Sequence, residues 1–158
     1  MLFSSIPFLY YFLPLVLICY FAAPKKLKNA VLFVFSLIFY AWGEPIHIIL
    51  MLVSVFVNWL LSRLIAHKDN CKIFIALSVI INIGLLTVFK YSGFIVETIN
   101  LIGTNLPVPE IHLPIGISFY TFQAMSYVID VYRDKKTYQK SFIAVLLYIS
   151  FFPQLIAG

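Results

Sequence analysis

LPIGISFYTFQAMSYVIDVYR, from Leu113 to Arg133, is an apolar stretch of membrane length that carries polar or small residues at regular steps. The steps run four, three, four and three residues, through Gly116, Tyr120, Gln123, Tyr127 and Asp130. On an α-helix, residues spaced in this way share one face. Because phenol, amide and carboxylate groups are costly in hydrocarbon, such a face is typical of a helix turned toward a bundle interior or a wet cavity. The stretch therefore predicts a membrane helix that packs among other helices.

The composition of the chain is that of an integral membrane protein. Hydrophobic residues make up 63% of the 158 residues and charged residues 11%, whereas about 25% of the residues of a soluble domain are charged. The mean hydropathy is +1.02. About twenty apolar residues cross the hydrocarbon core, and the runs that approach this length are Met1–Pro24, Asn29–Gly43, Pro45–Ser62, Ile73–Phe89, Ile111–Ile129 and Ser141–Gly158. The predicted fold is all-α, a polytopic transmembrane helix bundle of about five to six membrane helices, since the second run is short for a full crossing.

The segment Tyr91–Glu110 predicts a short interfacial helix rather than another crossing. Its apolar residues can share one face of a helix while its polar residues take the other. The apolar set is Phe94, Ile95, Ile99 and Ile102, and the polar set is Glu97, Asn100 and Thr104. The segment is either a lid or rim over an outward-facing cavity or a plain amphipathic connector.

The positive charges predict the orientation in the membrane, because Lys and Arg near helix ends are retained on the cytoplasmic side. With the N-terminus outside, the inner loops hold Lys25, Lys26, Lys28, Arg63, Lys68, Lys72, Arg133, Lys135, Lys136 and Lys140. The outer side then holds Lys90 with Glu44, Glu97 and Glu110. The net charge of +5 is thus a topology signal. No nucleic-acid partner is expected, since the basic residues form no continuous patch.

Polar residues also recur at every fourth position in other predicted helices. The sets are Ser36 and Tyr40; Ser54, Asn58 and Ser62; and Ser78 and Asn82. Small and amide side chains on one helical face are the usual means of close packing and interhelical hydrogen bonding in lipid. We interpret these sets as structural.

Residues of known catalytic chemistry are sparse. His47, His67 and His112 each fall near a predicted helix end or in a loop, and none has a serine or cysteine plus a carboxylate at a motif-like spacing. There is no phosphate-binding glycine-rich loop and no metal-ligand spacing. From the residues alone we therefore predict no catalytic residue and no metal site in this chain.

Two further pairs have simple structural interpretations. Asp130 and Arg133 stand three apart at a predicted helix end, where a solvated pair is expected. Cys19 and Cys71 both fall on the predicted cytoplasmic side, where thiols stay reduced, so no disulfide is expected. Neither cysteine has a nearby histidine with which to bind a metal.

The block at Leu113–Arg133 closely resembles the signature segment of the membrane-bound O-acyltransferases, in particular the bacterial alginate O-acetyltransferase branch. Further blocks resemble the same branch in the expected order: LFSSIPFLYYFLPL at Leu2–Leu15, VFSLIFYAWGEP at Val34–Pro45, FKYSGF at Phe89–Phe94 and FFPQLIAG at Phe151–Gly158. One block could arise by chance in so apolar a chain. Five in order over the whole length identify the resemblance.

This resemblance implies a multi-pass enzyme of the bacterial plasma (inner) membrane. Such an enzyme moves an acyl group, acetyl in this branch, from a cytoplasmic donor to a hydroxyl on the outer face. The implied donor is acetyl-CoA or an acyl-carrier thioester, with no bound cofactor. Related members acetylate exported polysaccharide such as alginate, acetylate peptidoglycan, or pass D-alanine toward teichoic acid. The implied partners are the lipid bilayer and extracytoplasmic acetyl-transfer proteins.

In that family a funnel thins the bundle, and an essential histidine on a later helix serves as general base. None of the three histidines here matches that residue, so no catalytic residue is carried over. The resemblance makes Ser118, Tyr120 and Gln123 candidates for the funnel lining. Gly116 would allow close backbone approach.

Family members continue for several helices beyond the position of Gly158. Residues 1–158 are therefore expected to be the N-terminal transmembrane part of such an enzyme, truncated before the catalytic-histidine region and inactive alone. Activity would need the missing C-terminal half or a separate catalytic subunit. The alternatives are a noncatalytic membrane subunit or scaffold, an inactive remnant and, with less support, a small transporter.

Overall fold

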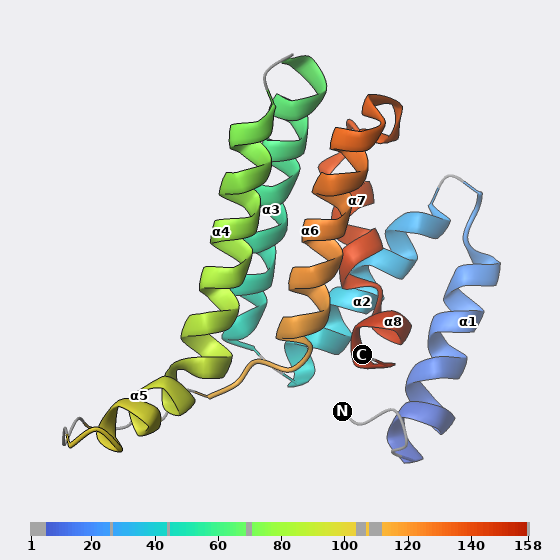
Figure 1. Cartoon of the computed structure of the whole chain (residues 1–158). Coiled ribbons are helices and arrows are strands. Elements are labelled where there is room, and N and C mark those ends of the chain that lie inside the picture. Colours follow the sequence, from blue (N-terminus) through green and yellow to red (C-terminus); the bar gives the residue numbers. More distant parts are fainter. Residues whose placement is uncertain are drawn as a thin grey trace.

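The computed structural model describes residues 6–25, 27–43, 45–68, 71–103, 107 and 112–157. Within them the chain is all-α, as the sequence predicts (Figure 1). The helical elements are η1 Phe8–Phe12, α1 Leu13–Ala22, α2 Lys28–Gly43, α3 His47–His67, α4 Lys72–Leu86, η2 Thr87–Tyr91, α5 Ser92–Asn100, α6 Ile117–Arg133, η3 Lys135–Thr137, α7 Phe142–Ser150 and α8 Phe152–Ala157. Each predicted apolar run therefore contains at least one helix, in the predicted order.

Among the described residues, two helical segments are long and apolar enough to cross a membrane. One is α3, and the other is Lys72–Asn100, in which α4, η2 and α5 directly follow one another along the chain. The outward faces of both are apolar and exposed, as at Phe56 (48%) and Ile80 (67%). Exposed apolar faces of this kind are suited to an apolar surrounding such as a bilayer. Shorter apolar helices cover Phe8–Ala22, Lys28–Gly43 and Phe142–Gln154.

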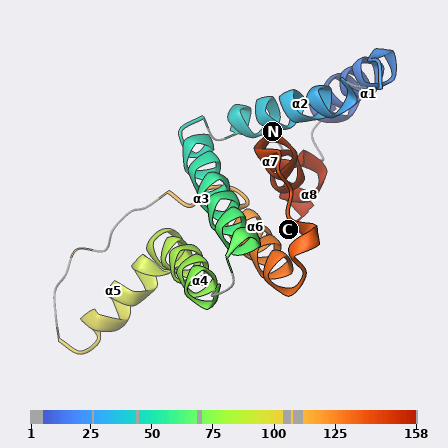
Figure 2. The same ribbon diagram turned by 90° about the horizontal axis from the view of Figure 1, so that it is seen from above.

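The main core lies where α6 packs along α3 and α4, and α7 packs between α2 and α3. Figure 2 shows α3, α6 and α7 in the middle, with the α1–α2 pair on one side and α4 with α5 on the other. On α6 the fully buried residues Ala124, Val128 and Val131 follow steps of four and three, so they form one stripe. Met51 and Val55 of α3 belong to the same buried cluster. Helical periodicity thus selects the face of each helix that forms the core.

A buried amide pair joins α3 to α4. Asn58 Nδ2 donates to Asn82 Oδ1 at 3.1 Å, and Asn82 Nδ2 donates to Asn58 Oδ1 at 2.8 Å. Ser78 Oγ donates to the same Asn58 oxygen at 2.7 Å, and Asn58 Nδ2 also reaches Ser54 O at 2.9 Å. All four residues are buried. The structural interpretation of these spaced polar residues is confirmed, because each amide has its partners inside the bundle.

A second cluster of aromatic rings joins η1 to α2 and α8. The Phe8 ring centre lies 5.5 Å from that of Phe39 and 6.1 Å from that of Phe152, both edge-on. Phe12 meets Phe152 edge-on at 5.6 Å. Edge-to-face pairs of this kind contribute about 0.5–1.5 kcal/mol each beyond area burial. The first helical segment, η1 with α1, is therefore held against α2 and α8 by edge-to-face aromatic pairs.

The segment predicted to form a short interfacial helix contains the short helix α5, and its position at a membrane interface stays a prediction. The π-helical turn η2 separates it from α4, and α5 projects away from the bundle (Figures 1 and 2). Thr87 Oγ1 donates to Ile83 O at 2.9 Å, a back-bond that together with a π-turn bends helices. None of the residues of α5 is buried, so its apolar face is not covered by the described helices. Thr104 and Pro109 of the predicted segment lie outside the described residues.

The last apolar run differs from the single span expected for Ser141–Gly158, because α7 and α8 are separate helices. Phe151 has φ −58° and ψ 112° and ends α7. Pro153 is the second residue of α8, where its missing N–H breaks no helical hydrogen bond. The Phe152 N–H donates to Ser36 Oγ of α2 at 3.4 Å. The break between α7 and α8 therefore directs the start of α8 against α2.

Basic residues gather at one end of the bundle. The end of α1 with the start of α2, the end of α3 with the start of α4, and η3 all lie at the top of Figure 1. Lys135 Nζ of η3 donates to Lys68 O at 3.0 Å, which ties two of these connections together. The start of α6 lies at the opposite end, where Lys90 Nζ donates to Ser118 Oγ at 3.1 Å.

Candidate functional site

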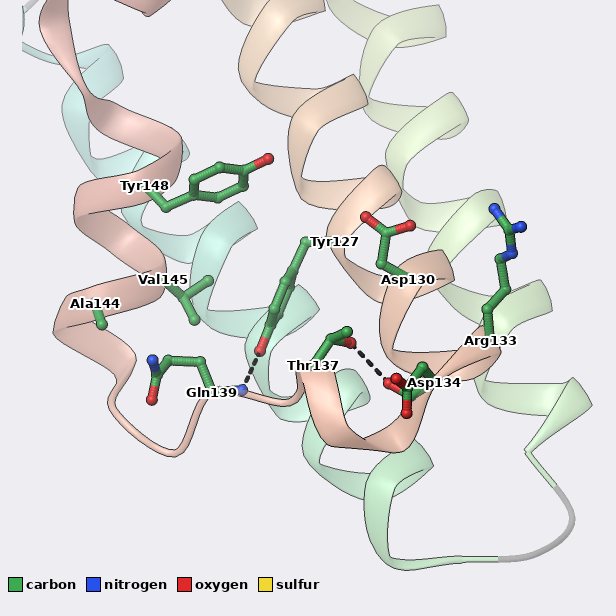
Figure 3. A pocket seen from close by; sticks show the side chains of 9 residues that line it. All are labelled: Tyr127, Asp130, Arg133, Asp134, Thr137, Gln139, Ala144, Val145 and Tyr148. Atoms are coloured by element: carbon green, nitrogen blue, oxygen red, sulfur yellow. Dashed lines mark hydrogen bonds between the residues drawn. The ribbon is translucent and has the colours of Figure 1, made fainter.

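The main candidate site in the described part of the chain is a cavity of about 690 Å³ at the basic end of α6. Figure 3 shows its lining, which α6, η3 and α7 supply. The lining residues are Tyr127, Asp130, Arg133, Asp134, Thr137, Gln139, Ala144, Val145 and Tyr148. Two residues of the predicted polar face, Tyr127 and Asp130, are among them. The polar face of this helix thus leads into a cavity.

Tyr127 fixes the inner wall of the cavity. Its hydroxyl oxygen accepts a hydrogen bond from the Gln139 N–H at 3.1 Å (Figure 3) and lies 3.4 Å from Ser62 Oγ of α3. The side chain is 8% exposed. One phenol therefore holds α3, α6 and the loop before α7 together, which gives the cavity a defined shape.

Charged residues lie at the mouth of the cavity. Asp130, Arg133 and Asp134 are all exposed. The Asp134 side chain caps η3 by accepting from the Lys136 N–H at 2.9 Å. Figure 3 shows the Asp130 carboxylate and the Arg133 guanidinium as separate groups on α6. The solvated helix-end interpretation of Asp130 and Arg133 agrees with their exposure, and both side chains also line the cavity.

Gln123 lies one helical turn deeper than Tyr127. Its Nε2 donates to Tyr148 O at 3.1 Å and lies within 3.4 Å of Gln154 Oε1. Tyr148 is two residues from the end of α7, where carbonyl groups lack intrahelical partners. Gln123 therefore ties α6 to the end of α7, and Tyr148 also lines the cavity.

Several buried polar atoms near this position lack a hydrogen-bond partner among the described residues. They are Tyr120 OH, Thr121 Oγ1, Gln123 Oε1 and Ser150 Oγ. An unpaired buried polar atom costs about 1–3 kcal/mol, so such atoms mark a place where a water or another polar group belongs. Three of them come from one stretch of α6, within two turns of the cavity wall.

Gly116 and Ser118 lie at the other end of α6. They line a smaller cavity of about 210 Å³ with the residues around them. Gly116 has φ 73° and immediately precedes α6. The Tyr40 hydroxyl donates to Ile115 O at 3.2 Å and holds this turn against α2. The candidate funnel residues therefore separate into two places: Tyr120 and Gln123 inside the bundle, Gly116 and Ser118 at the start of the helix.

Replacing Gly116 by alanine is expected to lower the free energy of unfolding by about 1–2 kcal/mol, because φ 73° is strained for a residue with a Cβ. Thermal unfolding in detergent measures the change. Gly84→Ala is the matched control. A Cβ at Gly84 would meet nothing within 4 Å, and alanine is preferred to glycine inside a helix by about 1 kcal/mol. Equal destabilisation by both changes would contradict the role of φ at Gly116.

The histidines lie at both ends of the bundle. The rings of His47 and His112 stack with centres 5.7 Å apart and planes 21° apart, at the end where α6 begins. His67 Nδ1 pairs with Arg63 O at 2.8 Å at the basic end. Among the described residues, no group of three or more histidine, cysteine or carboxylate side chains is placed to hold a metal ion.

Sequence reasoning missed Gln139, Thr137 and Tyr148 as parts of the cavity. No periodic signal marks them, since they meet α6 across a turn and a second helix. Their only sequence signal is position, directly before and within the apolar run that follows α6.

Comparisons with known proteins give relatives that match the chain over its entire length. It is 36% identical to the probable alginate O-acetylase AlgI of Azotobacter vinelandii and covers 34% of that protein. It is also 36% identical to the protein of the same name from Pseudomonas aeruginosa, with 32% covered. The Helicobacter pylori peptidoglycan O-acetyltransferase is 29% identical, with 36% covered. The chain thus spans about a third of the length of the curated relatives it matches. No family model matches it, and no solved structure is significantly similar.

Proposed function

We propose that this chain, which is homologous over its whole length to part of the alginate O-acetylases, forms the N-terminal membrane part of an O-acyltransferase. The enzyme would move an acyl group, acetyl by its relatives, from a cytoplasmic donor to a hydroxyl of a polysaccharide outside the membrane. The observation that carries the proposal is the homology to O-acetyltransferases with two acceptors. The order of the sequence blocks supports the N-terminal position.

Placement in a bacterial inner membrane is supported by the helices themselves. α3 and Lys72–Asn100 have the length and hydropathy of membrane spans. The shorter helices α1 with η1, α2, α6 and α7 with α8 would complete the polytopic bundle with tilt or local thinning of the bilayer. The clustering of basic residues at one end supports a cytoplasmic position for that end and an outer N-terminus, by the positive-inside rule.

The path of the acyl group would follow the polar face of α6. The donor thioester, acetyl-CoA or an acyl carrier, would approach from the basic end, where the 690 Å³ cavity opens. Tyr120 and Gln123 lie deeper on the same helix, and their unpaired oxygens support a role along a wet path. We propose that the general base is a histidine on a continuation of the chain or on a separately encoded subunit.

The acceptor proposed is an alginate-type glycan. The alginate O-acetylases of Azotobacter and Pseudomonas aeruginosa are 36% identical to the chain, against 29% for the peptidoglycan enzyme. Extracytoplasmic acetyl-transfer proteins would then complete the delivery to the polymer.

Complementation tests this function. The complete reading frame that contains this chain is expressed in an alginate-producing bacterium whose own alginate O-acetylase gene is deleted. Ester-linked acetate is expected to return to the exported polysaccharide, measured by NMR. Acetate on peptidoglycan alone would indicate that peptidoglycan, and not an alginate-type glycan, is the acceptor. Acetate on neither polymer would contradict acyl transfer and leave a noncatalytic scaffold.

A further inference from the structure

A second cavity at the basic end lies apart from the polar face of α6. It has a volume of about 350 Å³ and is lined by Trp59, Arg63, His67, Tyr138 and Lys140. Three of these five side chains carry or can carry positive charge, and two are aromatic. None of the described residues that line it is acidic. The lining is therefore suited to an anion that also has apolar parts.

The contacts around this cavity hold α3 against the loop before α7, and they do not neutralise the positive charges of the lining. Trp59 Nε1 donates to Gln139 O at 3.1 Å, which pins the loop before α7 to α3. The guanidinium carbon of Arg63 lies 5.9 Å from the centre of the Trp59 ring. Arg63 and Lys140 are exposed, and within the described part of the chain neither has an ion-pair partner. The cavity thus combines an aromatic ring, Trp59, with two cationic side chains, Arg63 and Lys140, that no described carboxylate neutralises.

His67 adds a ring nitrogen to the cavity. Its ring meets the Tyr138 ring edge-on at 5.8 Å. Because a carbonyl oxygen only accepts, its Nδ1 carries the hydrogen that binds Arg63 O. Nε2 is then the nitrogen left for a ligand, and it donates when the ring is protonated. Lys140 directly precedes Ser141, the N-cap of α7, so the positive end of that helix dipole lies beside the cavity.

An apolar surface continues from the cavity along α3 and α7. The Phe142 ring centre lies 5.7 Å from those of Trp59 and Phe56. Phe56 is 48% exposed and Ile143 56% exposed. A soluble phosphate would use the charged part alone. A phospholipid would use both parts, with its phosphate at the cations and its acyl chains along the rings.

We propose that this cavity binds the phosphodiester head group of an anionic phospholipid such as phosphatidylglycerol. Basic pockets between membrane helices on the cytoplasmic side are suited to anionic head groups. The proposal rests on the membrane placement proposed above. It does not depend on acyl transfer.

Native mass spectrometry of the full chain in detergent tests the site. Phosphatidylglycerol or phosphatidylcholine is added, and the retained lipid is counted. We expect a preference for phosphatidylglycerol that falls roughly fivefold for each charge removed in Arg63→Gln/Lys140→Gln. Lys25→Gln/Lys72→Gln removes two exposed charges from the same end of the bundle and is expected to keep the preference. Lys140→Gln alone serves as a second variant, because the Lys140 side chain is exposed and exposed substitutions usually change stability little.

Three outcomes would overturn the proposal. They are equal retention of both lipids, an equal loss in both double variants, and displacement of phosphatidylglycerol by excess inorganic phosphate, which would assign the site to a soluble phosphate. Recovery of the protein in the membrane fraction is measured separately. Its failure would refute the membrane placement, whereas a lost lipid preference with normal recovery would refute the lipid site alone.

Discussion

Gln123→Leu is expected to reduce acetyl transfer by the complete enzyme roughly tenfold or more, while membrane insertion is unchanged. Leucine ends one atom short of the position of the amide nitrogen and cannot donate to Tyr148 O, which Gln123 Nε2 reaches at 3.1 Å. The tie between α6 and the end of α7 would be lost, and a carbonyl near a helix end would lose its partner. Displacement of α7 would change the wall of the cavity, because Tyr148 lies on α7 and also lines the cavity. Ester-linked acetate per amount of membrane protein measures the effect.

The matched control for this variant is Ser126→Leu. Ser126 lies on α6 within one turn of Gln123 but on the exposed face, so the change also replaces a polar side chain by leucine without reaching the cavity. Normal acetate is expected. A normal level of ester-linked acetate with Gln123→Leu as well would show that Gln123 has no role in acyl transfer. Equal losses of acetate in both variants would indicate a general defect of α6.

Asn58→Ala is expected to lower the free energy of unfolding by about 1–3 kcal/mol, because the buried Asn82 Oδ1 loses its donor and the buried Ser78 hydroxyl loses its acceptor. The Asn58 oxygen accepts from both Asn82 and Ser78. Asn58→Ala/Asn82→Ala is expected to cost less than the sum of the single changes, since each single change already breaks the shared pair. Coupling energies of such pairs in membrane proteins average about 0.6 kcal/mol and reach about 1.7 kcal/mol. Unfolding in SDS or by heat in detergent measures each variant.

Thr87→Ala is the control for the amide pair. The Thr87 hydroxyl bonds only Ile83 O on its own helix, so its removal breaks no contact between α3 and α4. A change within about 0.5 kcal/mol is expected. Strict additivity of the Asn58 and Asn82 changes would show that the two amides do not act as a pair.

Much of the fold follows from local sequence. The apolar runs locate the helices because each helix is formed by neighbours in the chain. The steps of three and four on α6 select its polar face, and Tyr127 and Asp130 of that face line the cavity. The same rule selects Ser54, Asn58 and Asn82 for buried packing. The break at Phe151 was missed because hydropathy is continuous across it, and only the backbone turn and the contact with Ser36 reveal it.

The sequence predicts only the part of the candidate site that lies on α6. The family resemblance groups Gly116, Ser118, Tyr120 and Gln123 as funnel candidates, yet Ser118 pairs with Lys90 at the far end of α6 while Gln123 contacts α7. The spacing of residues one or two turns apart on a helix does not indicate which neighbouring helix each of them contacts. That choice depends on how the helices cross and on the loops between them.

The all-α class, the positions of the apolar helices, the basic loops and the polar face of α6 can be predicted from the amino-acid order, because all of these are local patterns of spacing and charge. Three features depend on the packing of the helices: Gln139 and Tyr148 close a cavity over Tyr127, Asn58 pairs with Asn82, and Arg63 and Lys140 share a pocket. These contacts join residues far apart in the chain. They exist because burial of the helix faces fixes one arrangement of the bundle, and no single helix carries that information.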